Sequence, residues 1–152
     1  MLKIKKNTLS SQDVIELLEE HLQDMRDTSP PESIHALDIE ALQQGDIEFF
    51  TAYDKTNLAG CVALKKLNHK DGEIKSMRTA NKYRGVGIGK ELVNFIVNHA
   101  KTKGLNTLYL ETGTQPFFKP ARRLYKQCGF TECLPFANYK LDENSCFMKL
   151  VL

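Results

Sequence analysis

The spacing of apolar residues along the chain predicts helices and strands before any motif is considered. Apolar residues at 2 and 4 alternate with lysines, which predicts a first strand. From Val14 to Met25 apolar residues recur every three or four positions, which predicts an amphipathic helix with Ser10 as its N-cap. A second, short helical region is expected within 33–44, because Gly45 provides a suitable helix end.

The following segments have the alternation of strands and then change to a helical period. Polar turns separate three strand-like segments, which predicts an antiparallel meander of 47–53, 58–67 and 73–79. A helix over 87–103 and a strand over 105–111 follow, and this βαβ unit should make strands 73–79 and 105–111 parallel and near neighbours. The expected α/β (α+β) chain is completed by a helix over 119–128, a strand from 130–133, a loop over 135–144 and a last strand over 146–152.

The segment between the third meander strand and the long helix has the character of an anion site. It reads Arg84-Gly85-Val86-Gly87-Ile88-Gly89-Lys90, with glycines at alternate positions. Glycine accepts positive φ and lets a ligand approach the backbone, and the free N–H groups of a first helical turn attract negative charge. The glycines alone are equally compatible with a solvated turn in front of an amphipathic helix.

Two common phosphate loops fit this segment poorly. A Walker A loop needs a glycine five residues before its Gly-Lys pair and Ser or Thr after it, but the chain has Arg84 and Glu91 there. A dinucleotide fingerprint needs a third glycine where the chain has Lys90. Glu111 lies at a suitable distance for a ribose contact, so the dinucleotide interpretation is weakened but stays open.

Two motifs together resemble the GNAT family of N-acetyltransferases. Arg84, Gly87 and Gly89 fit the Arg-x-x-Gly-x-Gly loop that holds the pyrophosphate of acyl-CoA in that family. Residues 121–130, Ala-Arg-Arg-Leu-Tyr-Lys-Gln-Cys-Gly-Phe, resemble its A-x-x-L-Y-x-x-x-G-F segment. The resemblance covers about 73–130. It implies the GNAT acyl-CoA N-acyltransferase fold over one domain, 1–152, with a mixed, mostly antiparallel central sheet around the βαβ unit.

The resemblance also implies acetyl-CoA as co-substrate, without a metal. In the family, the strand before the glycine loop parts from its neighbour near a bulge and leaves backbone groups for the pantetheine arm. The Met77 N–H is the candidate that polarises the thioester carbonyl. The full set of expected cofactor contacts is Met77, Arg78, Thr79, Arg84, Gly85, Val86, Gly87, Ile88, Gly89, Lys90 and Tyr125.

Acetyl transfer to an amine needs a proton donor for the leaving thiolate and an acceptor for the amine proton. Tyr125 stands at the tyrosine of the family's L-Y pair, where a hydroxyl reaches the CoA sulfur, so it is the expected general acid. The alternative for Tyr125 is a core aromatic on an amphipathic helix. Glu73 and Glu111 lie beside the expected cleft, and either could take the amine proton directly or through water. Each could instead be a solvated strand end, and family members differ in where they keep a base.

The chain departs from the family pattern at two positions. Phe118 stands where the family often has asparagine, so one pantetheine or amide contact is expected to be missing or replaced. Asn81 replaces a frequent proline before the glycine loop. Four cations near the presumed cleft offer either a site for an acceptor carboxylate or contacts with solvent and CoA phosphates: Lys75, Arg78, Arg122 and Arg123.

Composition narrows the function classes. The chain has 152 residues, 41% apolar and 26% charged, which suits one globular domain. Its net charge of +2 is too small to argue for a nucleic-acid or membrane surface. No apolar run approaches a membrane span, and the basic start lacks the apolar block of a signal peptide, so the expected location is the cytoplasm. The four cysteines form no C-x-x-C pair, which favours free thiols and no metal site.

These observations predict an acetyl-CoA-dependent N-acetyltransferase. It is expected to move the acetyl group to a primary amine of a small molecule by direct attack, because no cysteine lies where a nucleophile is needed. A homodimer stays open. The main alternative is a non-catalytic acyl-CoA-binding or regulatory module on the same fold, since a fold does not fix function. The intact Tyr125 disfavours that module, and the missing third glycine disfavours a dinucleotide-binding domain.

Overall fold

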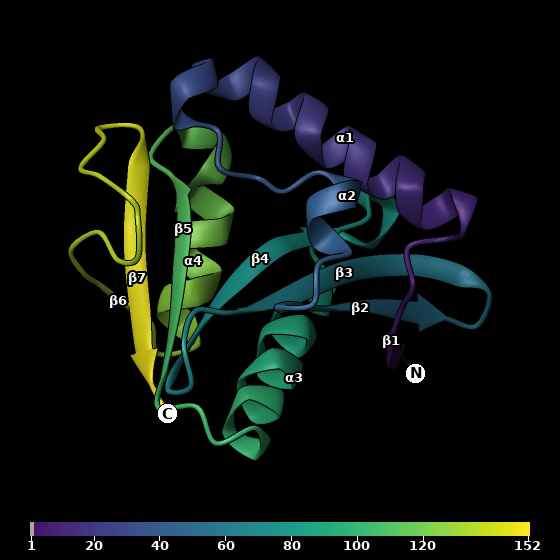
Figure 1. The fold of residues 1–152 in the computed structure, drawn as a ribbon. Helices are drawn as coiled ribbons and strands as arrows, with labels where there is room; N and C mark the ends of the chain where they lie inside the picture. The colour runs from purple at the N-terminus through teal and green to yellow at the C-terminus, as the bar shows by residue number, and fades with distance from the viewer. Residues whose placement is uncertain (1) are drawn as a thin grey trace.

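Within residues 2–152, which the computed structural model describes, the chain folds around a seven-stranded sheet with helices on both faces (Figure 1). The strands follow the order β1-β2-β3-β4-β5-β7-β6 across the sheet. Their bounds are β1 Leu2–Lys6, β2 Ile47–Asp54, β3 Asn57–Lys66, β4 Asp71–Thr79, β5 Thr107–Gly113, β6 Thr131–Glu132 and β7 Ser145–Val151. The helices are α1 Gln12–Thr28, α2 Ile39–Leu42, α3 Ile88–Thr102 and α4 Lys119–Gln127.

Strand pairing in the sheet is mostly antiparallel. β1, β2, β3 and β4 pair in succession, and β2 to β4 form the predicted meander. β4 and β5 are parallel neighbours joined through α3, as expected for the βαβ unit. β7 pairs antiparallel with β5 on one side and with β6 on the other. The predicted α/β (α+β) class with a mixed, mostly antiparallel sheet is confirmed.

The helices form two layers because neighbouring residues of each strand point to opposite faces. On β3, Cys61 and Ala63 pack in the apolar cluster that contains α1 and α2, whereas Val62 and Leu64 pack in the cluster that contains α3 and α4. The predicted apolar stripes face the core, with Leu22, Met25 and Val97 half-buried and the other members buried. The buried residues of these two helices are Val14, Leu17 and Leu18 in α1, and Ile88, Leu92, Val93, Ile96 and Ala100 in α3.

The sheet splits between β4 and β5. These strands pair only from Asp71 to Glu73 on β4, and among the described residues the rest of this β4 edge has no strand partner. A bulge lies in the same region, because β3 advances two residues from Cys61 to Ala63 while β4 advances three from Arg78 to Lys75. Ser76, inside the bulge, has φ of 49°, and its carbonyl oxygen accepts a hydrogen bond from the Cys61 thiol at 3.2 Å. The split and bulge are those that the family resemblance implied.

The structure refines the bounds of two predicted helices. α1 starts one residue later than expected, with Ser11 as N-cap, and Asp13 Oδ1 accepts from the Val14 N–H in its first turn. The short helical region expected within 33–44 is confirmed as α2, a single turn that Asp38 caps by accepting from Ala41 N–H, while 34–38 has no regular structure. Residues 33–35, before α2, are held by distant partners, because the Ser33 hydroxyl donates to Asp142 and the His35 carbonyl oxygen accepts from Lys75.

Candidate functional site

A cavity of about 710 Å³, the first cavity, opens where β4 and β5 separate. On one face of the sheet it is lined by α1 and the segment 29–36. On the other face it is lined by the glycine loop, the start of α3 and α4. Because the strands part here, the first cavity joins the two faces, and two reactants can meet in it from opposite sides.

The glycine loop meets the first cavity with an open backbone. Gly85 and Gly87 have φ of 78° and 90°, a region that favours glycine, and Gly87 is the N-cap of α3. A Cβ built on Gly87 would meet no atom within 4 Å, so the space beside it is free for a ligand. Gly89 has a different role, since a Cβ there would lie 2.9 Å from Leu124 Cδ2, and its absence lets α3 approach α4 closely. The open loop and the positive end of α3 together are suited to bind an anion.

Every predicted cofactor contact except Val86 lines the first cavity. The Val86 side chain is 68% exposed, so only its backbone can face a ligand in the loop. Arg84 and Lys90 are exposed at the rim, where their charges reach an anion at the helix start. Both predicted bases, Glu73 and Glu111, also line this cavity. The sequence therefore identified most of the lining on the α3 face.

Tyr125 combines both interpretations that the sequence offered. Its ring is buried in the core against Phe130, at 5.8 Å between ring centroids. Its hydroxyl donates to the Met77 thioether sulfur at 3.7 Å, which is a weak acceptor. Burial raises the pKa of Tyr125 well above its usual range, with the thiol of Cys128 adding to the effect. The hydroxyl therefore keeps its proton and is available to a ligand in the cavity.

Glu111 is a partly buried carboxyl group on β5, facing the side of the sheet that α1 covers. Burial raises the pKa of Glu111 to about 7, and the charge of Lys75 opposes this change. A carboxyl group with this pKa can exchange a proton at neutral pH, as general bases do. Its position at the end of β5 brings it into the same space as Tyr125.

Glu73 lies in a different environment from Glu111. It is 2% exposed, and its Oε2 atom accepts from the Tyr139 hydroxyl at 2.6 Å. Lys75 Nζ lies 3.3 Å from the same oxygen. The prediction that Glu73 is a solvated strand end is therefore wrong. Glu73 could take a proton from an amine only by giving up contacts with these two donors, which already bind its Oε2 atom.

The four cations near the cleft bind protein groups or solvent. The Arg78 side chain forms ion pairs with Glu20 at 2.6 Å and Asp24 at 2.8 Å on α1. Arg122 Nη1 donates to the carbonyl oxygens of Gly113 at 2.8 Å and Gln115 at 3.0 Å, next to the end of β5. Lys75 pairs with Glu73, and Arg123 is exposed. Three of the four cations are thus bound to protein groups, which neither alternative from the sequence included, and only the exposed Arg123 fits the alternative of contact with solvent.

Phe118 stands where the family often has asparagine, and its aromatic ring fits only because residue 113 is glycine. The ring is buried at the edge of the first cavity. A Cβ built on Gly113 would collide with it, at 2.1 Å from Phe118 Cδ2. Glycine at the end of β5 therefore makes room for the ring. At this position the chain therefore presents an apolar ring to the first cavity.

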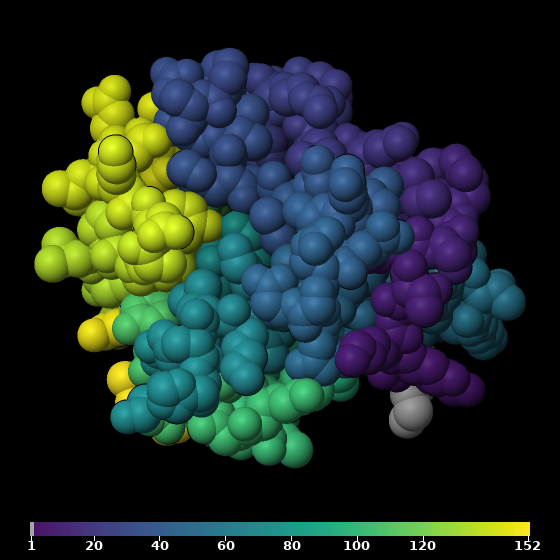
Figure 2. Space-filling model, in the orientation of Figure 1, coloured from purple at the N-terminus to yellow at the C-terminus, as the bar shows by residue number. Residues whose placement is uncertain are grey.

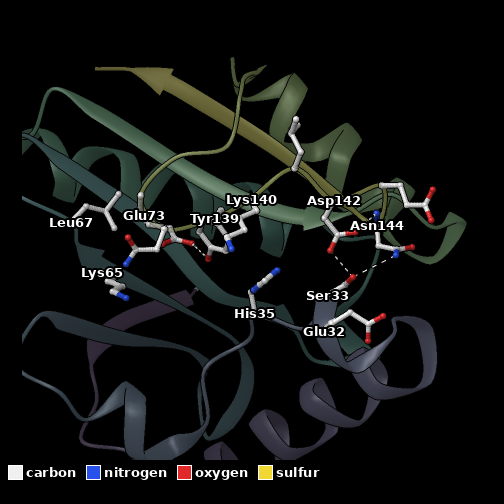
Figure 3. Close-up of a pocket in the computed structure, with 14 residues that line it drawn as sticks. Glu32, Ser33, His35, Lys65, Leu67, Glu73, Tyr139, Lys140, Asp142 and Asn144 are labelled. Atoms are coloured by element: carbon white, nitrogen blue, oxygen red, sulfur yellow. Dashed lines mark hydrogen bonds between the residues drawn. The ribbon is translucent and has the colours of Figure 1, made fainter.

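A second cavity, of about 580 Å³, lies beside the first and opens between the segment 32–35 and the loop 137–144 (Figure 3). Figure 2 shows the yellow C-terminal segment directly against the blue segment near residue 30. The two segments are joined where the Ser33 hydroxyl donates to Asp142 Oδ2 at 2.6 Å, and Asn144 Nδ2 donates to Ser33 at 3.4 Å. Ser33, Asn144, His35 and Glu73 line both cavities, so these residues form the wall between them.

Sequence reasoning missed two residues of this region. His21 on α1 was assigned no role in the site from the sequence, but it lines the first cavity. Burial and the charge of Arg78 lower its pKa to about 4, so it is neutral at physiological pH. Tyr139 lies in a segment that was predicted only as a loop, and no local pattern distinguishes it from other loop residues.

Other kinds of site are not seen in the described part of the chain. Among residues 2–152, no group of three or more His, Cys, Asp or Glu side chains is arranged to hold a metal ion. The four cysteines are free thiols, as expected. None of the described helices has the length and apolar character needed to cross a membrane.

Comparisons with known proteins agree with this geometry. The sequence profile of the acetyltransferase (GNAT) family matches residues 12–130. The uncharacterized N-acetyltransferase YsnE of Bacillus subtilis is 46% identical over 145 residues, covering 95% of this chain and 96% of its own. An IAA acetyltransferase of Azospirillum brasilense is 36% identical over 137 residues, covering 90% and 88%. The crystal structure of a Bacillus subtilis acetyltransferase in complex with CoA has a similar fold, with a TM-score of 0.71 at 22% identity, covering 100% of this chain and 99% of that one.

The profile match includes both motifs that carried the resemblance, the glycine loop and the segment that ends at Phe130. The relatives match over nearly their full length, so the similarity extends beyond the two motifs. Together with the split sheet and the anion site at α3, this shows that the chain belongs to the GNAT family of acetyltransferases.

Proposed function

We propose that this chain transfers the acetyl group of acetyl-CoA to a primary amine of a small molecule by direct attack. The observation that carries the proposal is the first cavity, which brings an anion site, a free strand edge and two proton-transferring side chains into one space. The whole described chain, residues 2–152, serves as one catalytic domain in this proposal.

The donor would lie along the split of the sheet. Its pyrophosphate fits the glycine loop, where the start of α3 and the charges of Arg84 and Lys90 attract an anion. Its pantetheine arm, which resembles a short peptide, fits the unpaired edge of β4 beside Met77 and Thr79. The thioester then lies near the bulge, where the Met77 N–H can stabilise the oxyanion that forms during attack. Binding energy gained far from the reacting carbon positions it.

The reaction requires two proton movements. The neutral amine nitrogen attacks the thioester carbon, a C–N bond forms, and the C–S bond breaks. The amine proton passes to the ionised Glu111 carboxylate, directly or through a water molecule. The CoA sulfur leaves as a thiolate that the Tyr125 hydroxyl stabilises or protonates, and solvent restores the proton. Neither step needs a metal or a covalent enzyme intermediate.

The dimensions of the site support a small acceptor. The first cavity, of about 710 Å³, must hold part of the donor as well as the acceptor, and pockets of roughly 300–1,000 Å³ usually hold small molecules, so the space that is left favours a small acceptor. The acceptor would approach from the face that α1 and the segment 29–36 cover, because the glycine loop occupies the other face. His21 is neutral on that face, so it adds no positive charge against an incoming ammonium group.

Ligand choice is the first test of this proposal. We expect acetyl-CoA to bind with micromolar affinity, and NAD and ATP to bind far more weakly, because the loop lacks the third glycine and the Walker residues. Titration calorimetry with the three ligands measures this directly. Tighter binding of NAD than of acetyl-CoA would show that acetyl-CoA is not the donor.

A screen of small amines for CoA-thiol release tests the transfer reaction itself. If acetyl-CoA binds but no amine causes thiol release, the non-catalytic module is favoured.

Gly87→Ala should weaken acetyl-CoA binding by ten-fold or more. The methyl group projects into the space that the pyrophosphate needs, and positive φ costs an L-residue about 1 kcal/mol. Gly104→Ala is a matched control, since Gly104 has φ of 79° at the other end of α3, and its Cβ would also meet nothing within 4 Å. Both variants should lose similar melting temperature, and only Gly87→Ala should lose affinity. Equal affinities in the two variants would show that the loop is only a turn.

A further inference from the structure

A buried cluster of Glu73, Lys75 and Tyr139 connects three distant segments of the chain. Besides its bond to Glu73, the Tyr139 hydroxyl accepts from Lys75 Nζ at 2.8 Å. Lys75 Nζ also donates to the His35 carbonyl oxygen at 3.0 Å. The side chains of Glu73 and Lys75 are only 3% and 8% exposed. The cluster thereby ties β4 to the segment that follows α1 and to the loop before β7.

The ring of Tyr139 is fixed by other aromatic rings. It meets His35 and Phe136 edge-on at 4.9 Å and lies 5.5 Å from Phe147, measured between ring centroids. Burial raises the pKa of Tyr139 far above its usual range, and the charge of Glu73 adds to this. The hydroxyl therefore stays protonated and remains the donor to Glu73 throughout the working pH range.

The cluster lies at the wall between the two cavities (Figure 3). Glu73 and His35 line both cavities, Lys75 lines the first, and Tyr139 lines the second. In Figure 3 the Tyr139 hydroxyl points at Glu73, and the His35 ring lies between this pair and Ser33. A change at Tyr139 therefore acts on the face of the first cavity from which the acceptor would approach.

The charges of the cluster cancel. Glu73 carries one negative charge and Lys75 one positive charge at 3.3 Å, both almost without solvent. Each charge therefore has its counterion within the cluster. Glu111 has no such partner among the described salt bridges, and its pKa of about 7 suits proton exchange. The two carboxylates that the sequence could not separate therefore have different roles.

We propose that Tyr139 is a positioning residue of the acceptor site, whose hydroxyl locks Glu73 and Lys75 into one buried cluster that fixes the wall between the two cavities. The cluster holds the wall against which the acceptor binds, and it leaves Glu111 as the carboxylate that takes the amine proton. This inference rests on the proposed function. It assigns acceptor binding to a residue that touches neither the donor nor the reacting atoms.

Steady-state kinetics of Tyr139→Phe measure the positioning role. The variant keeps the ring but loses both hydrogen bonds of the hydroxyl, and a hydrogen bond to a charged group is worth roughly a ten-fold effect or more. We expect KM for the amine to rise about ten-fold, with KM for acetyl-CoA unchanged. Tyr53→Phe is the control, because it also removes a hydroxyl that donates to a carboxylate, that of Asp13, and neither residue lines either cavity. Equal amine KM values in the two variants would overturn the proposal.

Glu73→Gln supplies a readout that a purely structural role would not change. The charged or titrating groups that act on Glu111 are Lys75 and Glu73 from β4, Asp142 and Tyr139 from the loop before β7, and Tyr125 from α4. The Glu73 charge raises the pKa of Glu111, so its removal should move the acid limb of kcat/KM to lower pH. Turnover should fall less than ten-fold, well below the loss of 10²-fold or more expected for a lost general base.

The two variants distinguish this inference from the proposed function. If the wild type acetylates no amine, the proposed function is wrong, and the kinetic comparisons of the variants cannot be made. In that case Tyr139→Phe can still be judged by binding of the desacetyl product CoA and by melting temperature, and an unchanged melting temperature would show that the cluster fixes nothing. If the wild type is active but Glu73→Gln loses 10²-fold or more and also loses the acid limb, Glu73 is the base. The assignment of Glu73 to the cluster is then wrong.

Discussion

Replacing Glu111 with Gln should lower kcat/KM for the amine by roughly 10²–10⁴-fold at pH 8, with little change in acetyl-CoA affinity. Gln keeps the size and the hydrogen-bonding oxygen of the side chain but cannot accept a proton. Burial raises the pKa of Glu111 to about 7, so the wild-type carboxyl group is protonated and inactive below this pH and ionised above it. The wild-type kcat/KM should therefore rise with pH through about 7, and the variant should lack this limb.

Stability measurements test whether the loss of activity comes from unfolding of the variant. The folded state binds the Glu111 proton more tightly than the unfolded state, because burial raises the pKa from the ordinary value of 4.5. Its contribution to stability is therefore present at low pH and is lost as pH rises through about 7. Glu111→Gln should then melt no lower than the wild type at pH 8. Glu40→Gln, at an exposed position of α2, is the control for loss of a carboxylate. Full activity of Glu111→Gln with an intact acid limb would contradict the base assignment.

The fold could be predicted from the sequence wherever the local pattern and the final contacts agree. The alternation in β2, β3 and β4 matches their positions in the meander, and the period of α3 matches the stripe that it buries. The glycine run predicted a turn with positive φ, and Gly85 and Gly87 adopt it. In these parts each residue pattern and its tertiary environment require the same structure.

The two segments that face the acceptor side could not be predicted in the same way. The sequence allowed the short helix anywhere within 33–44, whereas the structure confines it to Ile39–Leu42 and leaves 34–38 irregular, next to Ser33, which donates to Asp142 across 109 residues of chain. Tyr139 binds Glu73 across 66 residues. Contacts over such separations leave no periodic signal, so a loop was all that the sequence indicated for Tyr139.

The difference between Glu73 and Glu111 has the same origin. Both are single glutamates at strand positions, and the sequence offered no reason to prefer one as the base. What separates them is the partner that each meets after folding. Glu73 meets a lysine and a tyrosine that satisfy its charge, and Glu111 meets a poorly solvated space. Local sequence encodes neither environment.

Tyr125→Phe should slow the chemical step by about 10²-fold while leaving acetyl-CoA affinity nearly constant. The ring packs against Phe130 and is retained, and the hydroxyl loses only a weak bond to the Met77 sulfur, so folding should be unaffected. The hydroxyl is needed because it stabilises the departing thiolate. We expect the lower end of the usual range for general acids, since burial raises the pKa of Tyr125 and makes complete proton transfer to a thiolate uphill.

The measurement must report the chemical step itself, because product release can limit steady-state turnover and hide the effect. Rapid-quench kinetics in a single turnover, with enzyme in excess of acetyl-CoA, give this rate directly. Tyr53→Phe is again the control, because it removes a phenolic hydroxyl from the surface bond with Asp13. A single-turnover rate equal to that of the wild type would make Tyr125 a packing residue. The thiolate would then have to take its proton from water, and the family tyrosine would serve only the core of this chain.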